Sequence, residues 1–287
     1  MSVADSDTAV SSGAFRRPAA PLRALVTGYD GYRLAGFEPG IHLGLPSPSL
    51  TVVVTIDEPL DIAAQATPEQ APGRYDTLAS GIATAPVTIR HDGNQHGVQL
   101  ALSPLGARAL LRVPTAALGS WVVGLEELLG PDARELTERL SLEPGWDERF
   151  AILDDVLTRR AAPAEIDPHL TRAWHLLVAG EGTRVGDVAH EVGWSRRHLV
   201  NKFVAEYGVT PKDVVRLSRF HRSHRMLKGA AGATLADVSA VCGYYDQAHL
   251  DRDFVEFTGL PPTQLPAHEL PNVQAGDAVV VVGVLDE

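Results

Sequence analysis

The chain has 287 residues, of which 45% are hydrophobic and 21% charged, so it is long enough for two globular domains of ordinary size. Its single cysteine excludes an intramolecular disulfide and a cysteine-rich metal site. No apolar run approaches the roughly 20 residues that a membrane-spanning helix needs, and no secretory pattern opens the chain. We therefore expect a cytoplasmic protein with no membrane contact.

The net charge of −11 is distributed unevenly along the chain. Up to Asp167 there are 13 Arg, no Lys and 22 acidic residues, whereas residues 168–265 contain 12 basic and 10 acidic residues. Only the second region is not repelled by nucleic-acid phosphates. Its positive excess is small, so we expect DNA affinity to depend on individually placed contacts and on dimerisation.

The first third of the chain has the pattern of a β-rich domain. Residues 1–20 are rich in Ser, Ala and Pro and are expected to be disordered. Residues 50–56 read LTVVVTI, which predicts a buried strand. Residues 88–102 predict a hairpin that turns at Asp92, Gly93 and Asn94.

From residue 104 the hydrophobic pattern takes the period of helices. Residues 104–111 predict a short helix, and residues 113–130 predict a run of short helical turns. Residues 131–142 and 146–160 predict two amphipathic helices. We favour packing of their apolar stripes on the β-rich domain; a seam with a second subunit is the alternative, and the two are compatible.

Residues 185–265 contain the same helix-turn-helix pattern twice. The turn glycines are Gly193 and Gly243, each followed by an aromatic residue and then by a helix-capping residue. Each second helix carries an apolar pair four positions apart, and its other face is left for solvent. A helix presented in this way fits the major groove of duplex DNA. A plain helical bundle is the alternative, and the duplication argues against it.

Three sequence blocks carry a resemblance to a known family. They are A-x-x-x-G-W-S from Ala189, R-L-x-x-F-x-x-S-x-x-M-L from Arg216, and GYYDQAHLDRDF followed by TGLPP from Gly243. With them, residues 169–265 resemble the DNA-binding domain of the AraC/XylS family of transcription regulators. The resemblance implies a seven-helix unit in which the helix that begins at Pro211 holds two helix-turn-helix subdomains at a fixed separation.

The expected fold class is therefore α+β, with a β-rich, barrel-like N-terminal domain and helices followed by an all-α double helix-turn-helix domain. The β-rich part resembles the sensor or oligomerisation domains of that family. The expected boundaries are a disordered N-terminus at 1–20, a sensor or oligomerisation domain at 21–160, a linker at 161–167, the DNA-binding domain at 168–266 and a tail at 267–287.

The first predicted recognition helix supplies most of the candidate DNA contacts. Ser195 is expected to cap it and to donate to a phosphate. Arg197 and Asn201 lie one turn apart on the outward face, where Arg can bind guanine and Asn adenine, each contributing roughly 1–3 kcal/mol of discrimination. Arg196 and Lys202 lie towards the edges of that face and are predicted phosphate contacts.

The second predicted recognition helix and the central helix supply the remaining candidates. Gln247 and Arg252 are the expected base or phosphate contacts of the second helix. Asp251 and Asp253 depart from the expected pattern, because an acid mostly repels the DNA backbone, so we expect weaker or indirect contacts there. Thr210 is expected to cap the central helix, whose N-terminus can then bind a DNA phosphate. The two recognition helices are expected to enter major-groove segments about 34 Å apart.

Other residue types suggest no chemistry of their own. Cys242, just before a turn glycine, is expected to be packed. His42, His91 and His96 could form a metal site in a barrel, but polar roles at the surface or at the hairpin are favoured. The chain has no G-x-S-x-G, P-loop or G-x-G-x-x-G motif. We therefore expect neither an enzyme nor a metal or cofactor site.

The sequence thus predicts a regulator that binds double-stranded promoter DNA. Its N-terminal domain would sense a small-molecule effector, form a homodimer, or do both, and RNA polymerase is a further candidate partner. In the alternative, the N-terminal domain binds a partner protein or only dimerises, without sensing a small molecule. An apolar cavity of ligand size, or its absence, distinguishes the two.

Overall fold

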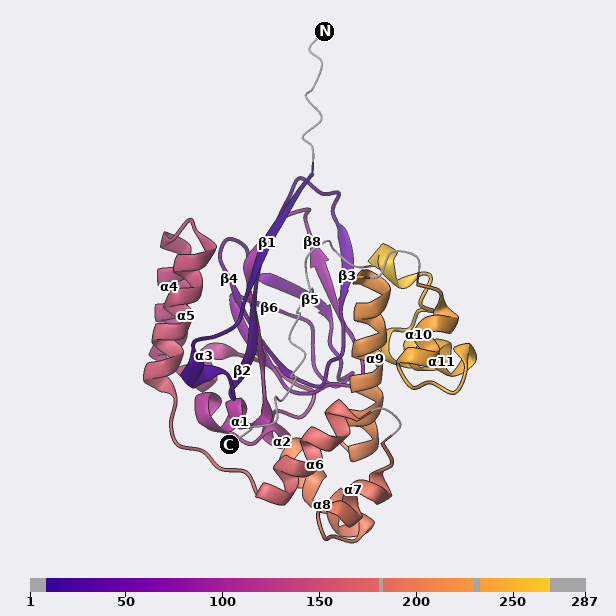
Figure 1. Ribbon diagram of the computed structural model, residues 1–287. Coiled ribbons are helices and arrows are strands. Elements are labelled where there is room, and N and C mark those ends of the chain that lie inside the picture. Colours follow the sequence, from indigo (N-terminus) through magenta and orange to yellow (C-terminus); the bar gives the residue numbers. More distant parts are fainter. Residues whose placement is uncertain (1–8, 181–182, 230–232, 269–287) are drawn as a thin grey trace.

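The computed structural model describes residues 9–180, 183–229 and 233–268. Figure 1 shows a body of strands, with helices α4 and α5 on one side and helix α9 on the other. The remaining C-terminal helices lie at the outside, around α9. In the described residues, no helix combines the length and the apolar character that crossing a membrane requires.

The N-terminal domain contains two antiparallel sheets, which do not close into the barrel-like form expected from the sequence. The six-stranded sheet has the order β1-β2-β9-β4-β7-β10 and the four-stranded sheet the order β3-β8-β5-β6. The strands of the first are β1 (Val10–Arg16), β2 (Val26–Ala35), β9 (Gln95–Leu102), β4 (Leu50–Thr55), β7 (Thr77–Ser80) and β10 (Val122–Gly124), and those of the second are β3 (Gly40–Gly44), β8 (Val87–His91), β5 (Leu60–Ala64) and β6 (Gly73–Tyr75).

Strand β4 explains why the large sheet is buried on both faces. Val52 and Val54 belong to the main core, which includes the buried residues of α4 and α5. Val53, which points to the opposite face, packs with Ile62 and Ile89 of the small sheet. Because side chains alternate along a strand, an uninterrupted apolar run fits a strand that is covered on both sides. The predicted buried strand at residues 50–56 is confirmed by this arrangement.

The predicted hairpin at residues 88–102 is wrong. Its two strands form, but β8 pairs with β3 and β5 whereas β9 pairs with β2 and β4, so the chain crosses from one sheet to the other at the turn. Gly93 has a φ of 104°, and its carbonyl accepts a 3.1 Å hydrogen bond from the Phe37 amide. The turn itself forms where its residues predict it, but the partner of each strand is set by contacts distant in sequence.

Two further segments differ from the sequence-based expectation. Within the stretch expected to be disordered, residues 10–16 form β1, which pairs along its whole length with β2; residues 1–8 lie outside the described residues. Within the predicted run of helical turns, residues 122–124 form the edge strand β10 on β7. Both segments are short, and pairing with an existing strand supplies the backbone hydrogen bonds that local propensity does not.

Helices cover the large sheet and close the N-terminal domain. The predicted amphipathic helices are confirmed as α4 (Pro131–Leu142) and α5 (Trp146–Arg160). Their stripes, including Leu136, Leu140 and Phe150, are buried in the core of the chain itself. The shorter elements are η1 (Ala20–Leu22), α1 (Pro104–Gly106), the π-helical turn η2 (Ala107–Leu111), α2 (Thr115–Leu118) and α3 (Leu125–Leu129).

The C-terminal part is helical and follows the irregular segment at residues 161–167. That segment contacts the N-terminal domain, since the Ala162 amide donates to the Ala109 carbonyl at 3.1 Å. Asp167 then caps α6 by accepting from the His169 amide at 2.8 Å. The elements are α6 (Pro168–Ala179), α7 (Val185–Glu191), α8 (Arg196–Tyr207), α9 (Pro211–Gly229), α10 (Leu235–Val241), α11 (Gln247–Thr258) and the 3-10 turn η3 (Leu265–His268).

Candidate nucleic-acid interface

The first helix-turn-helix unit is formed by α7 and α8. Gly193 takes a φ of 73°, a left-handed conformation that side chains disfavour, and so allows the tight turn between the helices. Ser195 is the N-cap of α8 and accepts a 3.2 Å hydrogen bond from the His198 amide. Leu199 and Phe203 are fully buried, which fixes the face that α8 turns inward.

The second unit, formed by α10 and α11, repeats this geometry. Gly243 has a φ of 76°, and Asp246 caps α11 by accepting from the His249 amide at 2.8 Å. Leu250 and Phe254 are fully buried in the same way as their counterparts in α8. Thus the capping residue, the turn glycine and the buried pair predicted for each copy are all confirmed.

An aromatic–histidine contact is shared by the two units. Trp194 meets His198 edge-on, with ring centroids 4.7 Å apart and the planes at 85°. Tyr244 meets His249 in the same way, at 5.3 Å and 89°. In each unit the aromatic residue after the turn glycine therefore packs on the first turn of the recognition helix. This ring contact helps to fix the angle at which that helix leaves the turn.

The predicted contact residues on α8 form one exposed surface, whereas those on α11 belong to a separate unit. None of Arg196, Arg197, Asn201 and Lys202 makes a hydrogen bond or ion pair with the described residues. Arg252 uses one N–H on the Ala248 carbonyl of its own helix, at 3.0 Å. The exposed candidates are Ser195, Arg196, Arg197, Asn201, Lys202, Gln247 and Arg252.

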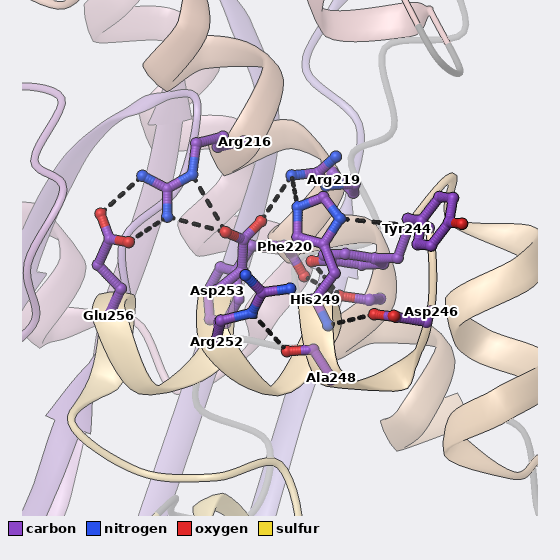
Figure 2. A network of polar contacts seen from close by, with 12 residues as sticks. Arg216, Arg219, Phe220, Tyr244, Asp246, Ala248, His249, Arg252, Asp253 and Glu256 are labelled. Atoms are coloured by element: carbon purple, nitrogen blue, oxygen red, sulfur yellow. Dashed lines mark hydrogen bonds and ion pairs between the residues drawn. The ribbon is translucent and has the colours of Figure 1, made fainter.

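Asp253 does not face outward, and its expected conflict with the DNA backbone does not arise. Its side chain is buried and accepts hydrogen bonds from Arg216 at 2.8 and 3.1 Å and from Arg219 at 2.7 Å. Figure 2 shows both guanidinium groups reaching from α9 to this carboxylate on α11. The acid therefore fixes the second recognition helix to the central helix. Arg219 therefore has an internal, structural role.

Glu256 extends the same network towards the surface. Arg216 also donates two hydrogen bonds to this carboxylate, one of them at 2.6 Å. These hydrogen bonds lower the pKa of Glu256, because they stabilise its ionised form, and raise that of Arg216. Arg219 is additionally stacked over the Tyr244 ring, 4.4 Å from its centroid. The orientation of α11 therefore depends on charge pairing as well as on apolar packing.

Thr210 caps α9, as the sequence predicts, in a reciprocal arrangement with Asp213. The Thr210 hydroxyl donates to the Asp213 carboxylate at 2.6 Å and accepts from the Asp213 amide at 3.2 Å. The carboxylate also accepts from the Thr210 amide at 3.1 Å. Because an internal anion already occupies this helix N-terminus, a DNA phosphate would have to share it. The phosphate contact at Thr210 stays a prediction.

The first recognition helix also contacts the N-terminal domain, which the sequence did not indicate. Arg108 of η2 donates two parallel hydrogen bonds to Glu206 near the end of α8, at 2.7 and 2.6 Å. Gly208, which ends α8 with a φ of 77°, lies so close to α2 that a Cβ there would meet the Cα of Ala116 at 3.1 Å. Thus α8 is held from both its own subdomain and the N-terminal domain.

A cavity of about 140 Å³ lies between the two sheets and is closed in part by α9. His42 of β3 and Phe220, His221 and His224 of α9 contribute to its wall. Burial lowers the pKa of His42 to about 4, with a further contribution from His91, and burial with His224 and Arg225 lowers that of His221 to about 4. Both rings are therefore uncharged at neutral pH. The surface or hairpin role expected for His42 is wrong, because the side chain is only 2% exposed.

The other two histidines have different environments. His96 is buried, and its Nδ1 lies 2.8 Å from the Asp57 carboxylate while its Nε2 lies 2.8 Å from Arg149. His91 lies on the next strand to His42, with ring centroids 5.7 Å apart. In the described residues, no group of three or more His, Cys, Asp or Glu side chains is placed to hold a metal ion. Cys242 is buried beside its turn, as predicted.

Comparisons with known proteins support this geometry. Residues 188–267 match the family described as "Helix-turn-helix domain". The C-terminal unit is a helix-turn-helix domain of the AraC type. An uncharacterized HTH-type transcriptional regulator from Bacillus subtilis, YbfI, is 29% identical over 70 residues, which are 24% of this chain and 25% of that protein. The matched region thus spans about a quarter of this curated relative's length.

The arrangement of the AraC-type domain behind two sheets has counterparts among solved structures. One structure of ToxT from Vibrio cholerae has a TM-score of 0.51 at 13% identity and covers 82% of this chain and 96% of ToxT. Another, of ToxT with an unsaturated fatty acid bound, has a TM-score of 0.52 at 9% identity and covers 88% and 97%. At this identity the likeness establishes the two-domain fold alone.

Proposed function

We propose that this protein is a sequence-specific DNA-binding transcription regulator that reads promoter DNA with α8 and α11. The observation that carries the proposal is the duplicated geometry: two N-capped helices, each fixed inward by a buried apolar pair, present exposed polar faces. The AraC-type domain, of the kind found in transcription regulators, supports the same proposal. A plain helical bundle gives no reason for the same turn, cap and buried apolar pair to occur twice.

Arg197 and Asn201 are the proposed base contacts of the first unit. They lie four positions apart on a helix that a Ser cap begins, and each can make two hydrogen bonds to a purine. Arg196 and Lys202 are proposed phosphate contacts at the edges of the helix, and Ser195 is proposed to donate there as well. These four side chains and the cap lie within the first two turns of α8.

Gln247 and Arg252 are the proposed contacts of the second unit. The separation of the two units is set by α9, whose 19 residues span about 28 Å at a rise of about 1.5 Å per residue. This length is compatible with recognition helices that enter adjacent major-groove segments about 34 Å apart. Asp251 is half-buried, so the polar face of α11 is narrower than that of α8.

For the N-terminal domain we propose sensing of a small molecule, which the cavity between the sheets favours over a purely structural role. A structure with the same fold has an unsaturated fatty acid bound, which is a property of ToxT. Binding of a partner protein, homodimerisation and contact with RNA polymerase stay predictions. A ligand could act by biasing the orientation of α8 and α11 relative to each other.

The test begins with a duplex selected from a random DNA pool by the purified chain. Arg197→Ala is then titrated against this duplex and against a scrambled one in gel-shift experiments. We expect a loss of discrimination of about 1–3 kcal/mol, roughly five- to 150-fold, with an unchanged fold. Arg134→Ala, the same change at an exposed position of α4, should bind as the native chain does. Unchanged affinity and discrimination in Arg197→Ala would contradict the assigned role.

Lys202→Ala distinguishes a phosphate contact from a base contact. It should weaken binding to selected and scrambled duplexes alike and reduce the slope of log K against log salt by about 1. A purely sequence-selective loss would show that Lys202 reads a base instead.

A further inference from the structure

The wall of the cavity between the sheets contains no Lys or Arg side chain among the described residues. Its acidic member is Asp30 of β2, and its other polar members are hydroxyl, amide and imidazole groups. Burial lowers the pKa of His42 and of His221, so these two rings add no positive charge that could balance an anion. A carboxylate entering this site would lose its hydration without a compensating ion pair.

His42 supplies the second observation. Its side chain is 2% exposed, and neither ring nitrogen makes a hydrogen bond with the described residues. A neutral imidazole has one N–H donor and one acceptor nitrogen, and leaving them unsatisfied in a buried site is costly. A hydroxyl group can both donate and accept, whereas a carboxylate only accepts and an ammonium only donates. A hydroxyl can therefore bond whichever ring nitrogen is turned towards the ligand, protonated or not, and it brings no charge into the cavity.

The size of the cavity limits the rest of the ligand. A dry cavity of about 150 Å³ is enough to hold benzene, and this cavity measures about 140 Å³. Apolar side chains of both sheets, including Ile62 and Ile89, and Phe220 of α9 form the remainder of its wall. These surfaces suit a single ring or a short hydrocarbon group.

We propose that the cavity binds a small uncharged molecule in which one ring-sized apolar group carries a hydroxyl, with the hydroxyl at His42 and the apolar part against Phe220. The inference rests on the proposed sensing function and names the class of ligand sensed. This class differs from the unsaturated fatty acid that ToxT binds.

The position of Phe220 gives such a ligand a route to the DNA-binding unit. Its ring lies 4.8 Å from Phe254 and 5.2 Å from Phe257, both on α11, measured between centroids. A ligand against Phe220 is thus one side chain away from the second recognition helix. A change in the packing of this ring alters the same contact that positions α11 on α9.

Three probes of equal size and different charge test the proposal: benzyl alcohol, benzoate and benzylammonium. Each is added at millimolar concentration to the full chain, and the melting temperature is measured at neutral pH. Benzyl alcohol should raise it by about 2–4 °C once its concentration is several times its Kd, whereas the two ions should not. Stabilisation by either ion equal to or greater than that by the alcohol, or no stabilisation by any of the three, would overturn the proposal.

A variant with a positive charge in the cavity wall tests the same proposal from the side of the protein. Gln99, half-buried on β9, contributes to the cavity, so Gln99→Lys supplies the positive charge that the native wall lacks. We expect this variant to gain stabilisation by benzoate. Gln264→Lys is the same change at an exposed position. In this variant the three probes should raise the melting temperature in the same order as in the native chain. An unchanged order in a folded Gln99→Lys would also overturn the proposal. DNA binding without ligand is measured separately, so either proposal can fail alone.

Discussion

Arg108 of the N-terminal domain holds Glu206 of the first recognition helix through two parallel hydrogen bonds, 2.7 and 2.6 Å long. The two residues are 98 positions apart, and they join the unit that would sense a ligand to the helix that would read DNA. Bidentate pairs of this kind are stronger and more directional than single contacts. The pair raises the pKa of Arg108, since hydrogen bonding to Glu206 favours its charged form.

This pair should contribute measurably to stability. In a double-mutant cycle of Arg108→Ala and Glu206→Ala, followed by urea unfolding, we expect a coupling of about 1 kcal/mol, because the Arg side chain remains one-third exposed. The Arg172–Glu191 pair is the control: both of its side chains are largely exposed, and its coupling should stay below about 0.5 kcal/mol. Equal coupling in the two cycles would contradict a special role for the inter-domain pair.

Substitutions at two glycines distinguish the cost of backbone strain from the cost of disturbing the contact between the domains. Gly208 and Gly259 end α8 and α11 with φ values of 77° and 76°, so an Ala at either should cost about 1–2 kcal/mol. Only at Gly208 would the new Cβ meet another segment, the backbone of Ala116 at 3.1 Å. We therefore expect Gly208→Ala to be the more destabilising and to expose the 161–167 segment to proteases. Equal losses in thermal unfolding would refute the contact with α2.

Asp253 should be the most sensitive polar position of the second unit. Asp253→Ala leaves Arg216 and Arg219, both mostly buried, without their shared carboxylate, and should cost about 3 kcal/mol or more. Glu256→Ala removes the exposed end of the same network and should cost less than about 1 kcal/mol. Chemical denaturation of both variants measures these losses in unfolding free energy. A loss for Glu256→Ala as large as that for Asp253→Ala would argue against buried Asp253 as the residue that holds α11 on α9.

His42 should make stability depend on pH. Its pKa is about 4 in the folded chain and 6.5 when unperturbed, so between these values the unfolded state binds the proton and the folded state does not. The stability that the folded chain has with His42 uncharged is therefore complete above pH 6.5 and is lost as the pH falls to about 4. The unfolding free energy falls by an amount on the order of 3 kcal/mol over this range.

His42→Phe tests this directly. The variant should be more stable than the native chain near pH 4, and its unfolding free energy should depend less steeply on pH from 6.5 downward. The loss of two unsatisfied ring nitrogens should also stabilise it at neutral pH. Parallel pH profiles for the two proteins, measured by urea unfolding, would show that His42 is not the titrating group.

Short sequence patterns predicted the helices, caps and turns, which are stabilised by interactions between residues close together in the chain. The bounds of α4 and α5 agree with those expected from the sequence, because proline starts, glycine stops and a 3.6-residue apolar period act within one helix. The caps Ser195 and Thr210 and the positive φ of Gly193 were predictable for the same reason. The exposed face of α8 followed from the position of its buried pair.

Relations between distant residues were not predictable in this way. Asp253 looked like an ill-placed surface acid because its partners, Arg216 and Arg219, lie on another helix. His42 looked like a polar residue near a strand start because only the meeting of both sheets with α9 encloses it. Strand β1 lies in a stretch of low-complexity sequence and gains its order from β2. In each case the decisive energy comes from a contact between segments far apart in the chain.

The sequence alone therefore determined a duplicated helix-turn-helix unit, its capped helices and the outward face of α8. Only the tertiary structure decided that residues 88–102 divide between two sheets, that Arg108 ties α8 to the N-terminal domain, and that α9 closes a cavity. The reason is physical: helix caps and turns are satisfied within a few residues. Strand partners, buried ion pairs and cavity walls depend on which segments distant in the chain come into contact. A periodic pattern within a few residues does not specify those partners.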